Sequence, residues 1–183
     1  MKRTMLLVAV MLLAVGITAQ AEAKGKSKKK NKTNTETAAT ARYAAAMEAL
    51  QLKSFIAAFD RVYSSGRSDY LTPRSNFVTL NGDKASLQLI VDPTVLGDNG
   101  IGGFTVEGTA SDFSMSTNKK GITRYKMTIT GPSLTCNVEI LLSPGDNTIR
   151  AEVISVLRGT RVSLSGTLAP YVATDVNRGG ISE

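Results

Sequence analysis

From Lys53 onward the apolar residues of this chain recur at every second position, and this period constrains the fold more than any other feature. In "ITRYKMTIT", Tyr125, Met127 and Ile129 point to one side of an extended chain, while the polar residues between them point to the other. The stretch "LTCNVEILLS" repeats the pattern, with Cys136 among its inward-facing residues. This alternation is typical of antiparallel strands that have one buried face and one solvated face.

Turn signals separate the alternating stretches at short intervals. Asn81-Gly82 is the strongest of them, because both residues accept the positive φ that a type I′ hairpin requires. The last four of the predicted strands should form a meander. The pattern predicts strands near residues 54–63, 76–81, 85–91, 103–109, 112–117, 122–130, 134–142, 148–157 and 161–168.

This arrangement predicts a mainly β fold, with a curled antiparallel sheet of eight or nine strands. The sequence leaves two closures open, a sandwich and a small open barrel like that of the lipocalins. The strand at 148–157 carries apolar residues on both faces, which predicts that it lies centrally and is covered on both sides. The natural cover is a helix that precedes the sheet.

That helix is predicted at residues 35–51, where Ala, Met and Leu replace the polar residues before them. Thr33 and Glu36 have the spacing of a capping box at the start of the helix. Tyr43, Met47 and Leu50 fall on one face at helical spacing, which predicts packing against the sheet rather than a ligand site.

Residues 1–21 have the three parts of a secretory signal peptide: a basic start, the apolar run "MLLVAVMLLAVGI" and small residues at alternate positions. Cleavage after Ala21 would use Ala19 and Ala21, and the alternative site after Ala23 would use Ala21 and Ala23. As a helix, the apolar run at 5–18 would reach only about 21 Å, which is short of the membrane's hydrocarbon core of about 30 Å. The leader has no Cys at its end, so we expect an exported protein, periplasmic or extracellular, that is not a lipoprotein.

The net charge of +7 belongs to the amino-terminal part of the chain. From residue 33 onward the sequence holds 14 basic and 14 acidic residues, so the body is neutral. Residues 22–34 are predicted to be a disordered linker, because they contain no large apolar residue. Six lysines in this linker could give weak electrostatic contact with a membrane surface: Lys24, Lys26, Lys28, Lys29, Lys30 and Lys32. No nucleic-acid partner is expected, since no basic and aromatic platform follows them.

The remaining domain boundaries follow from where the alternation ends. The helix and the sheet form one predicted domain at residues 35–168, interrupted by a loop at 92–102. Residues 169–183 have no period and are predicted to be a flexible carboxy-terminal tail.

Several stretches between residues 45 and 168 resemble a known family, the exported Bacteroidetes proteins grouped as domain-of-unknown-function family 4251. They are "ALQLKSFIAAFDRVY", the turn at Gly66, "LTPRSNFVTLNGD", the Lys-Lys turn before "ITRYKMTI", "VEILLSPGD" and "VSLSGTL". The chain departs from the family pattern at "LQLIVDPTVLG", where a block like Leu-Pro-Tyr-Phe-Gly is expected, and at Leu164, where a Tyr is expected. The resemblance implies an exported β-rich domain and supplies no activity.

The residue inventory removes most catalytic chemistry. The chain has no His, which excludes a Ser-His-Asp triad, a Cys-His pair and a His-ligated metal. Its single Cys, Cys136, excludes an internal disulfide and is predicted to be an inward-facing structural residue. A Ser-Lys dyad stays open, but no acidic pair has a recognisable catalytic spacing. We therefore predict no enzyme, and no catalytic, cofactor-binding or metal-ligating residue.

The glycines at 97, 100, 102 and 103 are not followed by the Lys-Ser/Thr pair of a nucleotide loop. Arg150, Arg158 and Arg161 are predicted to be charges on the outer face of the sheet. Two functions remain. One is a non-enzymatic envelope protein whose sheet surface binds another protein or a surface glycan, and the alternative is a carrier that holds a small apolar ligand inside the curled sheet.

Overall fold

The computed structural model describes residues 19–64, 67–92, 103–156 and 159–172, with side chains described from residue 35 onward. The chain divides into two units, Met1–Ala38 and Ala39–Glu183. The predicted signal segment up to residue 18, most of the predicted loop at 92–102 and the tail beyond residue 172 lie outside the described residues, as does Arg158.

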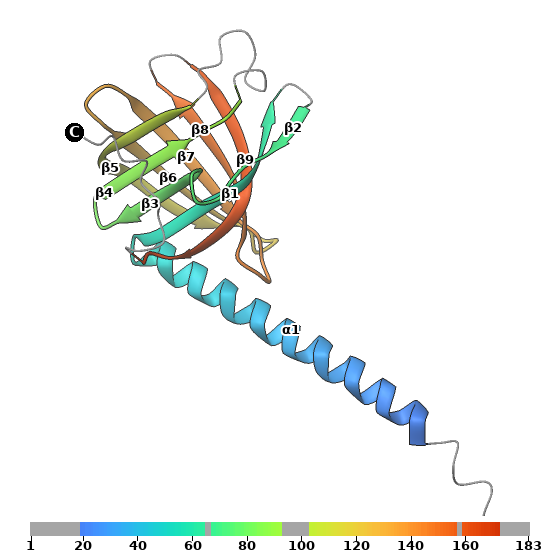
Figure 1. Ribbon diagram of the computed structural model, residues 1–183. Helices are drawn as coiled ribbons and strands as arrows, with labels where there is room; N and C mark the ends of the chain where they lie inside the picture. The colour runs from blue at the N-terminus through green and yellow to red at the C-terminus, as the bar shows by residue number, and fades with distance from the viewer. Residues whose placement is uncertain (1–18, 65–66, 93–102, 157–158, 173–183) are drawn as a thin grey trace, which may run out of the picture. The chain divides into compact units, whose positions relative to one another are not determined.

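Nine strands form one antiparallel sheet, which closes on itself because the first strand pairs with the last. Figure 1 shows the strands wrapping into a barrel in which β9 lies beside β1. The barrel contains eight strands, β1 and β3–β9, with β2 as an extra strand. This confirms the mainly β prediction. Of the two predicted arrangements, a sandwich and a small open barrel, the structure has a barrel, and that barrel is closed. The strands are β1 (Ser54–Ser64), β2 (Arg67–Tyr70), β3 (Phe77–Asn81), β4 (Lys84–Leu89), β5 (Phe104–Thr117), β6 (Thr123–Thr130), β7 (Thr135–Leu142), β8 (Thr148–Ser155) and β9 (Arg161–Pro170).

The last four strands pair consecutively, so the predicted meander is confirmed. The predicted strands at 103–109 and 112–117 are wrong as separate elements, because β5 runs through both. A bulge between Ser111 and Ser114 bends β5, and Asp112 has a φ of 53° there. The bulge interrupts the alternation, and the sequence pattern therefore placed a boundary between two strands here.

The extra strand β2 is a finding that the sequence pattern did not predict. Both β2 and β3 pair antiparallel with β1, with Tyr70 opposite Arg61 and Phe77 opposite Ala58. The loop between them, 71–76, is therefore an insertion in what would otherwise be one long strand. Backbone hydrogen bonds of 2.8 Å close both ends of the insertion, from the Leu71 N–H to Asp60 O and from the Phe59 N–H to Asn76 O.

The interior of the barrel is filled by inward-facing side chains from its strands. Phe55 contacts Tyr125 edge to face, with ring centroids 5.6 Å apart. The rest of the interior is mainly aliphatic, as the low aromatic content predicts. The largest side chains that are fully buried include Phe55, Phe59, Leu80, Leu87, Leu89, Ile129, Ile140, Leu142, Ile149 and Leu164.

The strands covered on both faces are β3 and β4, each of which has a single exposed residue at the hairpin between them. The prediction that strand 148–157 is covered on both sides is wrong. On the outer face of β8, Arg150 is exposed, and Val156 just after its end is 54% exposed. Apolar residues on both faces of a short strand did not require burial of both faces, since single exposed apolar residues are normal.

Helix α1 spans Ala19–Gln51 and so begins well before the predicted start at residue 35. Its range includes Thr33, Glu36 and the stretch 22–34, for which the sequence predicts a capping box and a disordered linker. Extending a helix costs little once it is formed, and Lys, Ala and Glu are good helix formers. Among the described residues, no helix is both long and apolar enough to cross a membrane.

The carboxy-terminal turns of α1 pack into the same core as the barrel, which confirms the predicted packing face. Ala46, Ala49 and Leu50 are buried, and Tyr43 and Met47 pack against the same cluster. The Thr123 hydroxyl of β6 donates a hydrogen bond of 3.4 Å to Met47 Sδ. The helix ends at Gln51, and Lys53 two residues later has a φ of 52°, the left-handed conformation common just after a helix.

Candidate functional site

A lateral row of polar side chains crosses the outside of the barrel from β6 to β1. The row takes one residue from each of five neighbouring strands, and each residue is the cross-strand partner of the next: Lys126 of β6, Glu139 of β7, Glu152 of β8, Ser163 of β9 and Tyr63 of β1. Side chains in one lateral row share a face, and none of these five is buried, so the row faces outward. We define the outer polar face by Tyr63, Arg124, Lys126, Glu139, Arg150, Glu152, Arg161 and Ser163.

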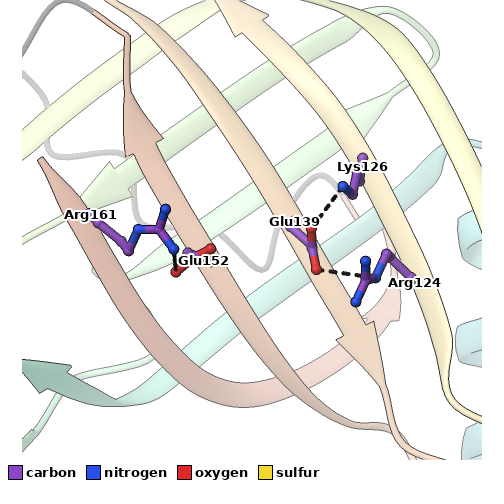
Figure 2. Close-up of polar contacts among 5 residues, drawn as sticks. All are labelled: Arg124, Lys126, Glu139, Glu152 and Arg161. Carbon is purple, nitrogen blue, oxygen red and sulfur yellow. Dashed lines mark hydrogen bonds and ion pairs between the residues drawn. The ribbon is translucent and has the colours of Figure 1, made fainter. Parts of the chain in front are cut away.

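Ion pairs fix both carboxylates of this face (Figure 2). Glu139 Oε1 lies 3.2 Å from Arg124 Nε, and its Oε2 lies 3.1 Å from Lys126 Nζ. Glu152 Oε1 accepts a hydrogen bond of 2.8 Å from Arg161 Nη1. Each carboxylate is therefore held in one direction, and cations on a neighbouring strand offset its negative charge.

Two shallow hollows lie on the outer polar face, one on each side of the Glu139–Glu152 pair. The larger, which we call the Tyr63 hollow, has a volume of about 440 Å³. Its lining combines polar and apolar residues: Tyr63, Arg150, Ser163 and the two glutamates with Leu141, Ala151 and Leu164. The second has a volume of about 300 Å³ and includes Lys126, Asn137 and the same glutamates in its lining. The glutamate pair thus forms a shared wall between two depressions whose linings mix polar and apolar groups.

A hydrogen-bond chain positions the Tyr63 ring at the larger hollow. The Ser165 hydroxyl donates to Asp60 Oδ1 at 3.5 Å and lies 3.3 Å from the Tyr63 hydroxyl. Because the Ser165 proton is used for Asp60, the Tyr63 hydroxyl is the donor to Ser165. The Tyr63 side chain is 42% exposed, so a held aromatic ring faces solvent here.

The buried titratable groups lie inside the barrel, away from this face. Cys136 is fully buried, and burial raises its pKa to about 11, which confirms its predicted inward position. Burial likewise raises the pKa of Tyr125 to about 12. Both groups are held in their protonated, unreactive forms near neutral pH.

Within the part of the chain that the structure describes, no group of three His, Cys, Asp or Glu side chains is placed to hold a metal ion. The cleavage-site residues Ala19, Ala21 and Ala23 lie in the first turns of α1, and the six lysines of the predicted linker follow them in the same helix. Export and cleavage stay predictions.

The prediction that Arg150 and Arg161 lie on the outer face is confirmed. The sequence did not predict the hollow or the glutamate pair. Strand register was the signal that could have found them. If neighbouring strands of the predicted meander are aligned from their connecting turns, Lys126, Glu139 and Glu152 come to lie side by side.

These features define a closed antiparallel β-barrel with a leading helix and a hollowed polar outer surface. The family model described as "Domain of unknown function (DUF4251)" matches residues 37–168. The chain therefore belongs to the DUF4251 family, which confirms the resemblance.

One solved structure supports this assignment, a DUF4251 family protein from Bacteroides eggerthii DSM 20697. It is similar with 30% sequence identity and a TM-score of 0.68, over 74% of this chain and 91% of that chain. The comparison with curated proteins found no match.

Proposed function

We propose that this protein is a non-enzymatic binding module, exported to the bacterial envelope, that holds a glycan in the Tyr63 hollow. The observation that carries the proposal is the lining of that hollow, in which an exposed aromatic ring stands beside fixed polar groups. Its volume of about 440 Å³ lies within the range of small-ligand sites.

The lining suits a ligand rich in hydroxyl groups. Sugar hydroxyls are both donors and acceptors, so they need partners of both kinds. Glu139 and Glu152 offer acceptors, Arg150 offers donors, and Ser163 offers both. A glycan could therefore exchange its hydrogen bonds with water for hydrogen bonds with the hollow.

The lining is also held in place before any ligand arrives. Three ion pairs orient the two glutamates, and a hydrogen bond to Ser165 orients Tyr63. Side chains that are already ordered lose little entropy on binding, which leaves more of the interaction energy as affinity. This feature favours recognition over a merely solvated surface.

A glycan suits this face better than a protein partner does. Specific protein interfaces have an apolar core surrounded by a polar rim. Of the large apolar or aromatic side chains exposed on the described part of the chain, Tyr63 alone lines the hollow, and the apolar lining residues Leu141, Ala151 and Leu164 are half-buried or buried. The others lie elsewhere: Leu52, Tyr70, Ile90, Met115, Val156 and Val172.

The carrier alternative has less support than the outer face. An eight-stranded barrel has an interior just wide enough to be filled by side chains or to hold one small ligand. Here the inward-facing residues Phe59, Leu87 and Ile149 are all fully buried within one cluster. The interior volume is used for packing, whereas the hollows open outward.

Export is supported by the leader pattern at residues 1–21 and by the small residues Ala19 and Ala21 at the expected cleavage site. The absence of His from the sequence and the burial of Cys136 support a non-enzymatic role. An exported module with a rigid polar face would meet glycans at the cell surface.

The test is binding of the purified protein to an array of bacterial and plant glycans, compared with two variants. Tyr63→Ala removes the ring from the hollow, while Tyr70→Ala removes an exposed ring that lies on β2 and is not part of the lining. We expect Tyr63→Ala to weaken binding by about tenfold, as for a central contact residue, and Tyr70→Ala to leave it unchanged. Unfolding curves of both variants verify that each is folded.

A blank array would contradict the proposal, as would glycan binding that both variants retain. Recovery of one envelope protein by the native chain, with loss of that partner on Tyr63→Ala, would assign the face to a polypeptide instead.

A further inference from the structure

Arg150 is the cationic side chain of the Tyr63 hollow. It lies on β8 with Leu141 of β7 and Ser165 of β9 as its cross-strand partners. It is exposed and lines the hollow beside Tyr63 and Ser163. Its guanidinium group is therefore accessible to a ligand that rests on the ring.

The two glutamates that line the hollow with Arg150 are paired with other cations. Within the described residues, no carboxylate lies within ion-pairing distance of Arg150, and the nearby Glu139 and Glu152 are each paired with other cations. Two further carboxylates border the hollows, Asp60, which accepts the hydrogen bond from Ser165, and Asp112, which lines the second hollow, and among the described residues neither forms an ion pair with Arg150. Because Glu139 and Glu152 are each held by another cation, the guanidinium of Arg150 stays available for an anionic group of a ligand.

Arginine also has a geometry that suits one kind of anion. Its guanidinium presents planar N–H donors that match the two oxygens of a carboxylate, so the pair forms two parallel hydrogen bonds. The neighbouring Tyr63 ring and Ser163 hydroxyl suit the sugar ring that would carry such a carboxylate. A uronic acid combines these features in one residue.

We infer that Arg150 binds the carboxylate of a uronic acid, so that the ligand of the Tyr63 hollow is an acidic glycan. This inference rests on the proposed glycan binding and adds the chemical class of the glycan. The glutamate pair forms one wall of the site, and Arg150 supplies its anion contact.

The experiment compares two polymers that differ only in the charge of one group, polygalacturonate and its methyl-esterified form. Binding of the native protein to each is measured by calorimetry at constant ionic strength, together with Arg150→Gln, Arg150→Lys and the control Arg74→Gln. Arg74 is an exposed arginine of the 71–76 loop, so its variant has the same net charge as Arg150→Gln. This control separates the specific contact from general attraction between a cationic protein and a polyanion.

We expect the native protein to bind polygalacturonate about tenfold more tightly than the ester, as for one charge-assisted pair of hydrogen bonds. Arg150→Gln should remove this preference, Arg150→Lys should retain part of it because the charge remains, and Arg74→Gln should retain all of it.

Equal binding of both polymers by the native protein, lost on Tyr63→Ala, would overturn the inference and leave the proposed function standing. Binding of neither polymer would overturn the inference, and a blank glycan array would then remove the proposed function as well. Equal loss with Arg150→Gln and Arg74→Gln, or equal Arg150-dependent binding of polyglutamate, would also overturn it.

Discussion

Glu139 on β7 and Glu152 on β8 are direct cross-strand partners, so two carboxylates stand side by side on the outside of the barrel. Like charges in this position destabilise a sheet by a fraction of a kcal/mol to about 1 kcal/mol. The neighbouring strands offset the repulsion, with Arg124 and Lys126 on one side and Arg161 on the other. Three flanking cations therefore offset the repulsion within the wall between the two hollows.

The first prediction concerns this compensation. Arg161→Gln removes the single cation paired with Glu152 and leaves that carboxylate facing Glu139. The pair is largely exposed, so we expect the free energy of unfolding to fall by only about 0.5–1 kcal/mol at low ionic strength. Adding Glu152→Gln to Arg161→Gln should restore the lost stability, because it also removes the repulsion. Urea denaturation at low and at high salt measures both effects.

The control for this cycle is Arg74→Gln, which removes an exposed arginine without touching the glutamate pair. The account of the wall would be wrong if Arg161→Gln and Arg74→Gln had equal effects. It would also be wrong if the cost of Arg161→Gln persisted unchanged at high salt, where exposed charges are screened.

Much of the fold could be predicted because the alternation of apolar and polar residues is visible within each strand taken by itself. Stretches such as 122–130 and 134–142 alternate without interruption, and the structure places strands there with the predicted faces inward. Strand β2 could not be found in this way, since all four of its residues are exposed and none marks an inner face. Barrel closure also escaped prediction, because the pairing of β1 with β9 joins residues that are 100 or more positions apart in the sequence.

The candidate site depends on relations between strands, which a single stretch does not encode. Glu139 and Glu152 are 13 positions apart, and their contact depends on the register that the β7–β8 hairpin sets. The sequence did identify Arg150 and Arg161 as outer-face charges. It could not show that Arg161 has a partner while Arg150 lines a hollow, because that depends on side-chain geometry.

The second prediction concerns the close approach of β9 to β1. Gly166 is the partner of Phe59, where the register of the β1–β9 pair shifts. A Cβ on Gly166 would lie 1.9 Å from Ala58 O and 2.8 Å from Phe59 Cα, so backbone rather than a flexible side chain occupies the space. We expect Gly166→Ala to lower the free energy of unfolding by about 3 kcal/mol, measured by urea denaturation.

The matched variant is Gly145→Ala in the β7–β8 turn. Gly145 has a φ of +96°, and a Cβ added to it would have no other atom within 4 Å, so the substitution strains the backbone without a clash. Its expected cost is about 1–2 kcal/mol. If Gly145→Ala were the more destabilising variant, the closure of the barrel at Gly166 would not be as tight as described.

The third prediction concerns the hydroxyl of Tyr125. The side chain is buried in the barrel beside Phe55 and Phe113, and its hydroxyl has no hydrogen-bond partner among the described residues. A buried group without a partner costs about 1–3 kcal/mol. Tyr125→Phe keeps the ring and should therefore raise the free energy of unfolding, by about 1 kcal/mol. The comparison is Tyr63→Phe, which removes a hydroxyl that is bonded to Ser165 and should not stabilise the protein.

Thermal and urea unfolding of both variants decide this point. A loss of stability in Tyr125→Phe would show that its hydroxyl has a partner, such as a bound water.

The fourth prediction is a loss of stability at alkaline pH. Burial raises the pKa of Cys136 from its usual 9.0 to about 11, so between these values the folded chain keeps a proton that the unfolded chain releases. Stability is therefore intact below about pH 9 and falls as pH rises towards 11, with each unit of pKa difference worth about 1.4 kcal/mol. Tyr125, whose pKa is raised from 10.0 to about 12, extends the same decline to higher pH.

Cys136→Ala should make stability less dependent on pH between 9 and 11, even though the smaller side chain lowers stability at every pH. The measurement is a series of urea denaturation curves at pH 8, 9, 10 and 11 for the native protein and the variant. Tyr125→Phe serves as the comparison, because its effect on the slope should begin about one pH unit higher. Parallel curves for the native protein and Cys136→Ala would mean that the thiol is not held in its neutral form by burial.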